Sequence, residues 1–273
     1  MSRRTLALML LVVAASLAGC NAVSNGDGPT ATPSGDAQAI ASDAAATMES
    51  VETYRVTATI EQTVSANNQQ QTATVTSTAV FDRGERAFRI TRATSAAGRT
   101  REAAVYLVNG TLYERNPAYE RRYGSAWVKV DVAENLTETW RAQDTLTRQR
   151  LLLENATVTY EGTATVNGTK TDVLAVDGNE SAFESVVEER LGGVATDVEV
   201  SVENVSFTHY VAVESDRLRR SIGTLKMQVS AGARTVSQTQ RMNLTFSGYG
   251  APVDVTLPEG AAVAVSISNE SAG

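Results

Sequence analysis

Alternation of apolar and polar residues is the main pattern of the chain after residue 50. Between Tyr54 and Glu61 every second residue is apolar, and the residues between them are Arg, Thr or Glu. A period of two is that of a β-strand with one buried face and one wet face. The alternation returns from Ala73 to Phe81 after the turn sequence Asn67-Asn68-Gln69, which predicts a β-hairpin.

Similar runs continue along the chain and predict about eleven strands in all. Val105 to Leu107 leads into Asn109-Gly110, a dipeptide that favours the tight turn of a hairpin. The last two strands are expected at Val253–Leu257 and Val263–Ile267, on either side of a turn. Because strands do not alternate with helices, the sheet is expected to be antiparallel.

Three segments have the three- and four-residue spacing of amphipathic helices. Residues 36–51 form the first of them, and a second helix is expected between Ala133 and Glu154. A short third helix is expected from Ser181 to Leu191, because Gly192-Gly193 would end it. The pattern therefore predicts an α+β fold in a single domain over residues 36–267, followed by a disordered tail at 268–273.

The first 20 residues have the layout of an export signal. Two arginines precede an apolar run from Leu6 to Val13, which is too short to span a bilayer comfortably. We expect residues 1–19 to be a signal peptide, exported by either the twin-arginine or the general route. The closing Leu17-Ala18-Gly19-Cys20 resembles the lipobox of lipoproteins, so Cys20 is the expected lipid-attachment site. An ordinary signal peptide with a chance cysteine is the alternative.

Residues 20–35 follow the signal peptide as a lipid-bearing cysteine and a flexible tether. They are rich in Gly, Pro, Ser, Thr and Asn, which bury too little apolar surface to fold. One or two lipid chains on Cys20 would hold the protein at the outer face of the cytoplasmic membrane with its domain outside the cell.

The composition narrows the classes of partner and site. The chain has 31 acidic and 24 basic residues and a net charge of −7, whereas a nucleic-acid partner requires a concentrated basic face. The single cysteine excludes an internal disulfide and a cysteine-rich zinc site. Only Lys129, Lys170 and Lys226 are lysines, a bias that fits an acidic surface adapted to high salt or, equally, a GC-rich genome.

Eight Asn-x-Ser/Thr sequons make the exported chain a candidate glycoprotein. They begin at Asn109, Asn135, Asn155, Asn167, Asn179, Asn204, Asn243 and Asn269.

Residue types of catalytic and metal sites are scarce. His209 is the only histidine, and one imidazole without a candidate nucleophile is more typical of a structural residue than of a general base. Asp172, Asp177 and Asp197 lack the spacing of a calcium loop. No phosphate-binding loop, nucleophile elbow or zinc-protease motif is present in the sequence. We therefore expect no catalytic residue, no metal and no cofactor, and disfavour an enzyme.

The apolar faces of the later strands are the candidate binding surface. Ligand pockets are mostly apolar, and methionine adapts to varied apolar shapes. The same residues could equally form an ordinary helix-on-sheet core, since periodicity does not separate a filled interior from a hollow one. The candidate ligand-lining residues are Phe207, His209, Val211, Leu225, Met227, Met242, Leu244 and Phe246.

The order of these features resembles the LolA/LppX-type lipoprotein-carrier superfamily, and within it the uncharacterised lipoproteins of halophilic archaea. A helix leads into successive hairpins and long later strands, and Val105–Tyr113 and Tyr249-Gly250-Ala251-Pro252-Val253 add to the likeness. The resemblance implies a curved antiparallel half-barrel, covered by two or three helices over an apolar cavity for acyl chains. LolA itself is a soluble shuttle, whereas this chain is expected to be anchored.

Two functions from different classes follow. The first is a membrane-anchored, non-enzymatic carrier of a lipid or other apolar ligand. The second is a cavity-free surface domain that binds a partner protein of the cell envelope through its sheet edge or acidic face. Lipid extracted from the purified domain would favour the first function, and saturable capture of one protein would favour the second.

Overall fold

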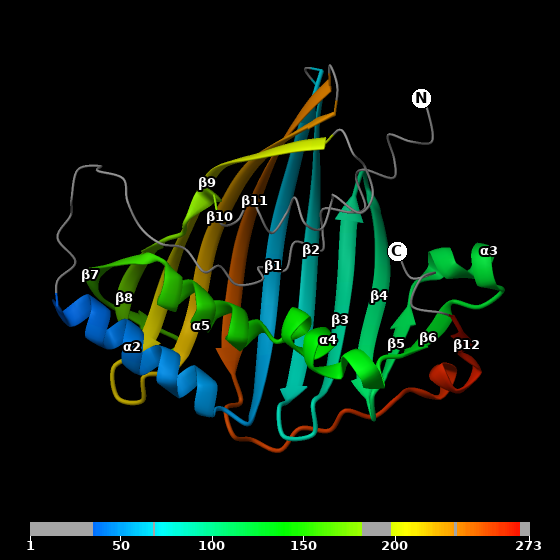
Figure 1. Ribbon diagram of the computed structural model, residues 1–273, viewed down its shortest axis with the longest axis horizontal. Helices are drawn as coiled ribbons and strands as arrows, with labels where there is room; N and C mark the ends of the chain where they lie inside the picture. Colours follow the sequence, from blue (N-terminus) through cyan, green and yellow to red (C-terminus); the bar gives the residue numbers. More distant parts are fainter. Residues whose placement is uncertain (1–34, 68, 182–197, 232–233, 268–273) are drawn as a thin grey trace.

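The computed structural model describes residues 35–67, 69–181, 198–231 and 234–267. Within these ranges the chain forms one open, curved sheet of twelve strands in the order β12-β6-β5-β4-β3-β2-β1-β11-β10-β9-β8-β7 (Figure 1). Neighbouring strands are antiparallel except β12 and β6, which run parallel. The α+β class with a curved antiparallel sheet is therefore confirmed.

The described strands are β1 (Thr53–Ala66), β2 (Gln69–Asp82), β3 (Ala87–Ala96), β4 (Arg99–Val108), β5 (Thr111–Arg115), β6 (Trp127–Asp131), β7 (Thr157–Val166), β8 (Thr169–Asp177), β9 (Val198–Ala212), β10 (Leu218–Ala231), β11 (Arg234–Ser247) and β12 (Val265–Ser266). The described α-helices are α2 (Gly35–Ser50), α3 (Glu120–Tyr123), α4 (Leu136–Gln143) and α5 (Thr145–Asn155). Short 3-10 helices are η2 (Pro117–Tyr119), η3 (Ala133–Asn135) and η4 (Glu259–Val263).

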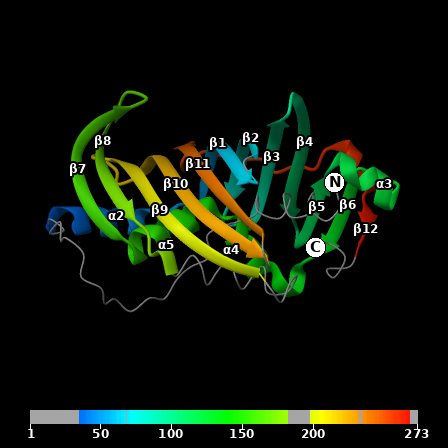
Figure 2. The same cartoon turned by 90° about the horizontal axis from the view of Figure 1, so that it is seen from above.

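Helices α2, α4 and α5 lie against one face of the sheet, which we call the inner face (Figures 1 and 2). An aromatic cluster joins this face to α4. The rings of Tyr54 and Phe81 stack with centroids 4.6 Å apart, and Trp140 of α4 meets Phe81 edge-on at 6.0 Å. Burying each such ring stabilises the fold by roughly 1.5–3 kcal/mol, which holds α4 over β2 and β3.

The hairpins expected from the alternation are confirmed. Strands β1 and β2 pair from Thr53 with Asp82 to Ala66 with Gln69. Asn109 and Gly110 both have positive φ, 50° and 72°, as a tight two-residue turn requires. The prediction worked here because the turn residues and the period of two specify the same register.

The prediction of a single helix between Ala133 and Glu154 is wrong, because this segment is helical but not continuous. The chain forms η3, α4 and α5, and the helices break at Asp144, whose backbone is extended at φ −66° and ψ 103°. The Asp144 carboxylate accepts bonds from Tyr54 and Arg83, so tertiary contacts determine the break.

The prediction of two C-terminal strands, at 253–257 and 263–267, is largely wrong. Residues 253–257 form no strand, because β1, beside which the segment starts, is already paired on both sides with β2 and β11. Of the last expected strand only the two residues of β12 pair, and Val263 lies in η4 with 72% of its surface exposed. The segment packs Leu257 onto a small cluster around Tyr106 and Trp127.

Three expectations lie outside the described residues. They are the signal peptide with all of the tether except Gly35, most of the helix at 181–191, and the tail at 268–273. Gly35, expected as the last residue of the tether, is instead the first residue of α2. None of the described helices is both long and apolar enough to span a membrane.

Candidate functional site

The eight residues proposed to line a binding surface come together on the inner face of three adjacent strands. The pairing sets Phe207 opposite Gly223 and Gly223 opposite Met242, and the next row joins His209, Ser221 and Leu244. Six of the eight are almost fully buried, whereas Met242 and Leu244 keep partial exposure. Their role as ligand contacts stays a prediction.

The apolar surface is larger than the sequence indicated. Val200 and Val202 at the start of β9, with Val229 on β10, are also buried. A β-bulge sets Asn204 opposite Lys226 and Val202 opposite Met227, so one extra residue lies in β9 at this point. The inner face of β9 therefore carries even-numbered residues before the bulge, such as Val202, and odd-numbered residues after it, such as Val205. A strict period of two that starts at Val205 would place Val202 on the other face.

Amide side chains interrupt this apolar surface on β1 and β11. Gln62 lies opposite Gln240, and both are buried together with Gln238. Among the described residues the Nε2 atom of Gln238 has no hydrogen-bond partner. A buried amide donor without a partner is costly, so this position is suited to a polar group of a bound molecule or to water.

Further unpartnered polar atoms occur on β9, β10 and α5. Ser221 is the cross-strand neighbour of His209, and Gln149 lies on the buried side of α5. Within the described part of the chain, both ring nitrogens of His209, the Ser221 hydroxyl and the Gln149 Oε1 atom lack partners. Ser221 and His209 therefore do not form the hydrogen bond that a nucleophile and its base share.

The inner face becomes charged toward β3 and β5. The pairing places Arg92 and Glu114 on the inner side of these strands. Burial lowers the pKa of Arg92, partly offset by the nearby Glu114 carboxylate. The Tyr119 hydroxyl donates to Glu114 at 2.8 Å. The surface thus runs from apolar at β9 and β10, through amides at β11 and β1, to charged at β3 and β5.

No group of three or more His, Cys, Asp or Glu side chains that could hold a metal ion occurs in the described ranges. The acidic residues Asp172 and Asp177 lie on β8, and Asp197 lies outside the described residues. Burial without a charged partner lowers the pKa of His209 to about 3, so its imidazole is neutral at physiological pH.

The pKa of His209 predicts a loss of stability in acid. The unfolded chain binds a proton at this residue near pH 6.5, whereas the folded chain does so only near pH 3. Above about pH 6.5 the neutral His209 therefore costs the folded chain nothing relative to the unfolded chain. As the pH falls below this value, the free energy of unfolding decreases by roughly 1.4 kcal/mol per pH unit. Urea unfolding between pH 7 and 4 measures it. The slope should be smaller in His209→Leu, and equal slopes in the two proteins would contradict the prediction.

Gly223 provides space for the ring of Phe207. A Cβ atom at this position would lie 2.3 Å from Cε1 and 2.4 Å from Cδ1 of that ring. Gly223→Ala is therefore expected to lower the free energy of unfolding by about 1–3 kcal/mol, although alanine normally stabilises a strand relative to glycine. Chemical denaturation measures the effect, with Thr224→Ala on the opposite face as the control. An unchanged or higher stability of Gly223→Ala would refute this packing.

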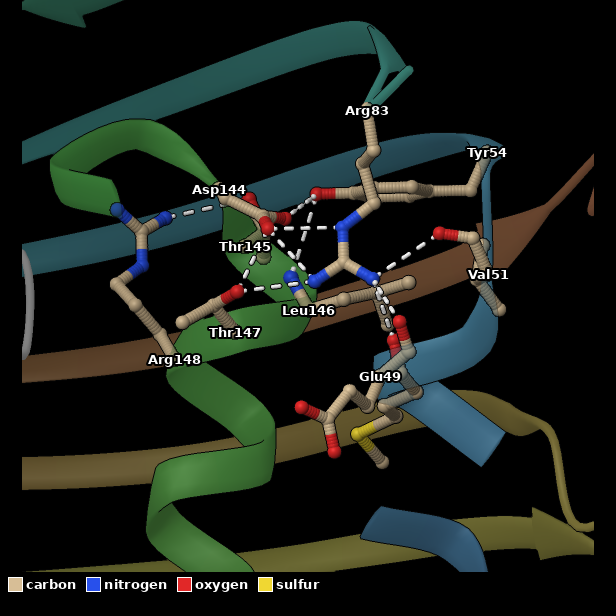
Figure 3. Close-up of polar contacts among 10 residues, drawn as sticks. Glu49, Val51, Tyr54, Arg83, Asp144, Thr145, Leu146, Thr147 and Arg148 are labelled. Atoms are coloured by element: carbon tan, nitrogen blue, oxygen red, sulfur yellow. Dashed lines mark hydrogen bonds and ion pairs between the residues drawn. The ribbon is translucent and has the colours of Figure 1, made fainter. Parts of the chain in front are cut away.

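A buried ion pair holds the helices to the sheet at one end of the site (Figure 3). Arg83, in the turn between β2 and β3, donates from Nε and Nη2 to Oδ2 of Asp144 at 2.9 and 2.8 Å. Tyr54 of β1 donates to Oδ1 of the same carboxylate at 2.6 Å, and Thr147 donates to its Oδ2 at 2.6 Å. Asp144 is thus bonded by side chains from β1, from the β2–β3 turn and from α5.

The same arginine also holds α2. Its Nη1 atom donates to the backbone carbonyls of Met48, Glu49 and Val51 at 2.7 to 3.0 Å, at the C-terminal end of the helix. A cation is favoured there because these carbonyls lack partners within the helix and lie at the negative end of its dipole. The Arg83–Asp144 network therefore fixes α2 and α5 above the inner face. No local sequence pattern predicts this network.

One known protein family matches most of the chain. The sequence model of the family described as "Family of unknown function (DUF6612)" matches residues 36–264 of the chain. No curated protein matches the sequence.

Solved structures that resemble the chain include LprF, the lipoprotein LppX and a LolA superfamily protein. LprF from Mycobacterium bovis is 16% identical, with 83% of this chain and 99% of LprF covered at a TM-score of 0.46. The lipoprotein LppX from Mycobacterium tuberculosis is 13% identical, and the match covers 81% of this chain and 98% of LppX at a TM-score of 0.43. A LolA superfamily protein from Nitrosomonas europaea is 12% identical, and the match covers 82% of this chain and 95% of that protein at a TM-score of 0.23.

Proposed function

The chain belongs to the DUF6612 family of unknown function, and we propose that it is a non-enzymatic protein that binds a lipid or similar apolar molecule on the inner face of its sheet. The observation that carries the proposal is the extent of the apolar inner face. Strands β9, β10 and β11 are 14 to 15 residues long, whereas the described helices cross only one end of them (Figure 1).

Apolar side chains continue along the inner face of these strands. Leu225, Met227 and Val229 follow one another at alternate positions of β10, and Val200 and Val202 face the same side of β9. These side chains are almost fully buried in the structure, so a bound acyl chain would take the place of the groups that bury them. Each Å² of apolar surface that the chain buries would stabilise the complex by roughly 25 cal/mol without any specific polar contact.

The polar atoms of this face favour an amphiphile over a pure hydrocarbon. The amide donor of Gln238 and the polar atoms of His209 and Ser221 lack partners within the described residues. A ligand that offers hydroxyl or carbonyl groups among its apolar parts would satisfy them. The Arg83–Asp144 network would keep the helices in place at one end while the ligand enters from the other.

Uptake of a fluorescent fatty acid tests the function. The chain from residue 20 onward, with Cys20→Ser to prevent lipidation, should raise the emission of the probe at a stoichiometry of one or less. Unlabelled lipid should displace the probe. Emission no higher than with an unrelated protein of equal charge, at any lipid tested, would overturn the proposal.

The membrane anchor is a separate part of the proposal. A lipid on Cys20 would keep the binding domain at the outer face of the cytoplasmic membrane, with the segment before Asp36 as its tether. In cells, Cys20→Ser is expected to move the protein from the membrane fraction to the medium or soluble envelope fraction. A variant that stays membrane-bound after a high-salt wash would exclude lipid anchoring at this residue.

A further inference from the structure

The outer face of the sheet carries a groove of about 740 Å³, on the side opposite the helices. Its floor crosses β1, β2, β3 and β4, and residues 258–260 form part of its rim. A volume of this size falls within the range of small-molecule sites in proteins. The proposed lipid surface lies on the other side of the same sheet, so the groove is a separate feature.

Small side chains arranged in two rows make the floor of the groove. One row contains Thr57, Thr78 and Thr91, which are cross-strand neighbours, and the other contains Thr59, Thr76 and Ala93. Neighbours within a row are about 4.8 Å apart, and the rows about 6.7 Å apart, from the strand geometry. The floor therefore presents a regular array of hydroxyl and methyl groups.

These hydroxyls are available at the surface. The four threonines on β1 and β2 are exposed, and Thr91 is half-exposed. The Thr78 and Thr91 hydroxyls bond to each other at 2.8 Å, which leaves each of them further capacity to donate or accept.

A largely buried aromatic pair, Tyr106 at 7% and Trp127 at 9% exposure, borders the groove. The rings of Tyr106 and Trp127 lie 5.9 Å apart between centroids, and both residues line the groove. Gly260 passes so close to Trp127 that a Cβ atom would lie 2.9 Å from its Nε1. The C-terminal segment thus fixes the indole in place by direct contact.

Few charged residues line the groove. Glu102 and Arg115 are its acidic and basic lining residues at the β4–β5 side, and their side chains approach to 3.9 Å. The lining also includes Arg92, whose residue position faces the inner side of the sheet. A phosphate or nucleic acid would need a surplus of cations at this surface, and an acyl chain would leave the hydroxyl array without partners.

We propose that this groove binds an uncharged oligosaccharide. Sugars present hydroxyl groups that both donate and accept, which matches the threonine rows. Sugars also present apolar C–H faces, which would pack on the threonine methyl groups. A peptide added as a strand is disfavoured, because β1 to β4 are each paired on both sides and offer no free edge.

Titration calorimetry with cellohexaose, maltohexaose, chitohexaose and mannohexaose tests the site. The test protein is residues 20–273 with Cys20→Ser. At least one sugar is expected to bind with a millimolar or lower Kd. Thr78→Val/Thr91→Val keeps the shape and strand preference of both residues but removes two hydroxyls, so it should weaken binding by about tenfold or more.

Thr63→Val/Thr72→Val is the matched control, because these two threonines form a similar exposed cross-strand pair outside the groove. It should bind the sugar as the parent protein does. Fatty-acid uptake by both double variants should be unchanged, which separates this site from the inner face. Failure of all four sugars to bind at millimolar concentration, or equal binding by both double variants, would overturn the proposal.

Discussion

Replacing Arg83 with methionine is expected to lower the free energy of unfolding by about 3–5 kcal/mol. The substitution leaves the Asp144 carboxylate, whose side chain is 1% exposed, without its cationic partner. It also removes the bonds from Arg83 to the carbonyls of Met48 and Glu49 in the last turn of α2 and of Val51 just after it. Urea unfolding followed by circular dichroism measures the loss.

A nearby arginine provides the control for this prediction. Arg86 lies in the same turn and makes one exposed bond, to Thr137 at 3.2 Å, so Arg86→Met should change stability by less than about 1 kcal/mol. Arg83→Met/Asp144→Leu should recover part of the loss, because it removes both charges together. A loss below about 1 kcal/mol in Arg83→Met would show that the network does not hold the helices.

Replacing Met242 with glutamate is expected to weaken lipid binding by at least tenfold. Met242 lies on the inner face of β11 between Gly223 of β10 and Ile60 of β1. A carboxylate there would lie against the apolar part of a bound lipid, where an unpaired charge is strongly disfavoured. Displacement of a fluorescent fatty acid measures the change, and thermal unfolding verifies that the variant is folded.

The neighbouring residue on the same strand distinguishes the two faces of the sheet. Asn243 is exposed on the outer face, where Arg220 donates to its side chain at 2.9 Å. Asn243→Glu adds the same charge without placing it on the inner face, so lipid binding should be unchanged. Equal losses in the two variants would point to net charge as the cause and would contradict binding on the inner face.

Local patterns were sufficient to predict most of the sheet. The hairpin of β1 and β2 and the turn at Asn109-Gly110 were predictable because turn chemistry and alternation specify the same pairing. Where the two do not coincide, the prediction was wrong. Residues 253–257 alternate like a strand but meet no free edge, and Asp144 interrupts a helical pattern because its side chain bonds to distant residues.

The candidate site was predictable only in its apolar half. Phe207, Leu225 and Met242 share a face because their strands alternate in register. Val200 and Val202 were missed because a bulge changes the parity of β9. The groove on the outer face depends on which threonines become cross-strand neighbours and on where residues 258–260 return, and both follow from the tertiary fold.

Native mass spectrometry tests the central claim most directly. The chain from residue 20 with Cys20→Ser, purified without detergent in high salt, is predicted to carry one non-covalently bound lipid-sized molecule that is released on unfolding and recovered by organic extraction. A protein that carries no such molecule, and that also takes up none of the lipids added to it, would contradict a lipid-binding inner face.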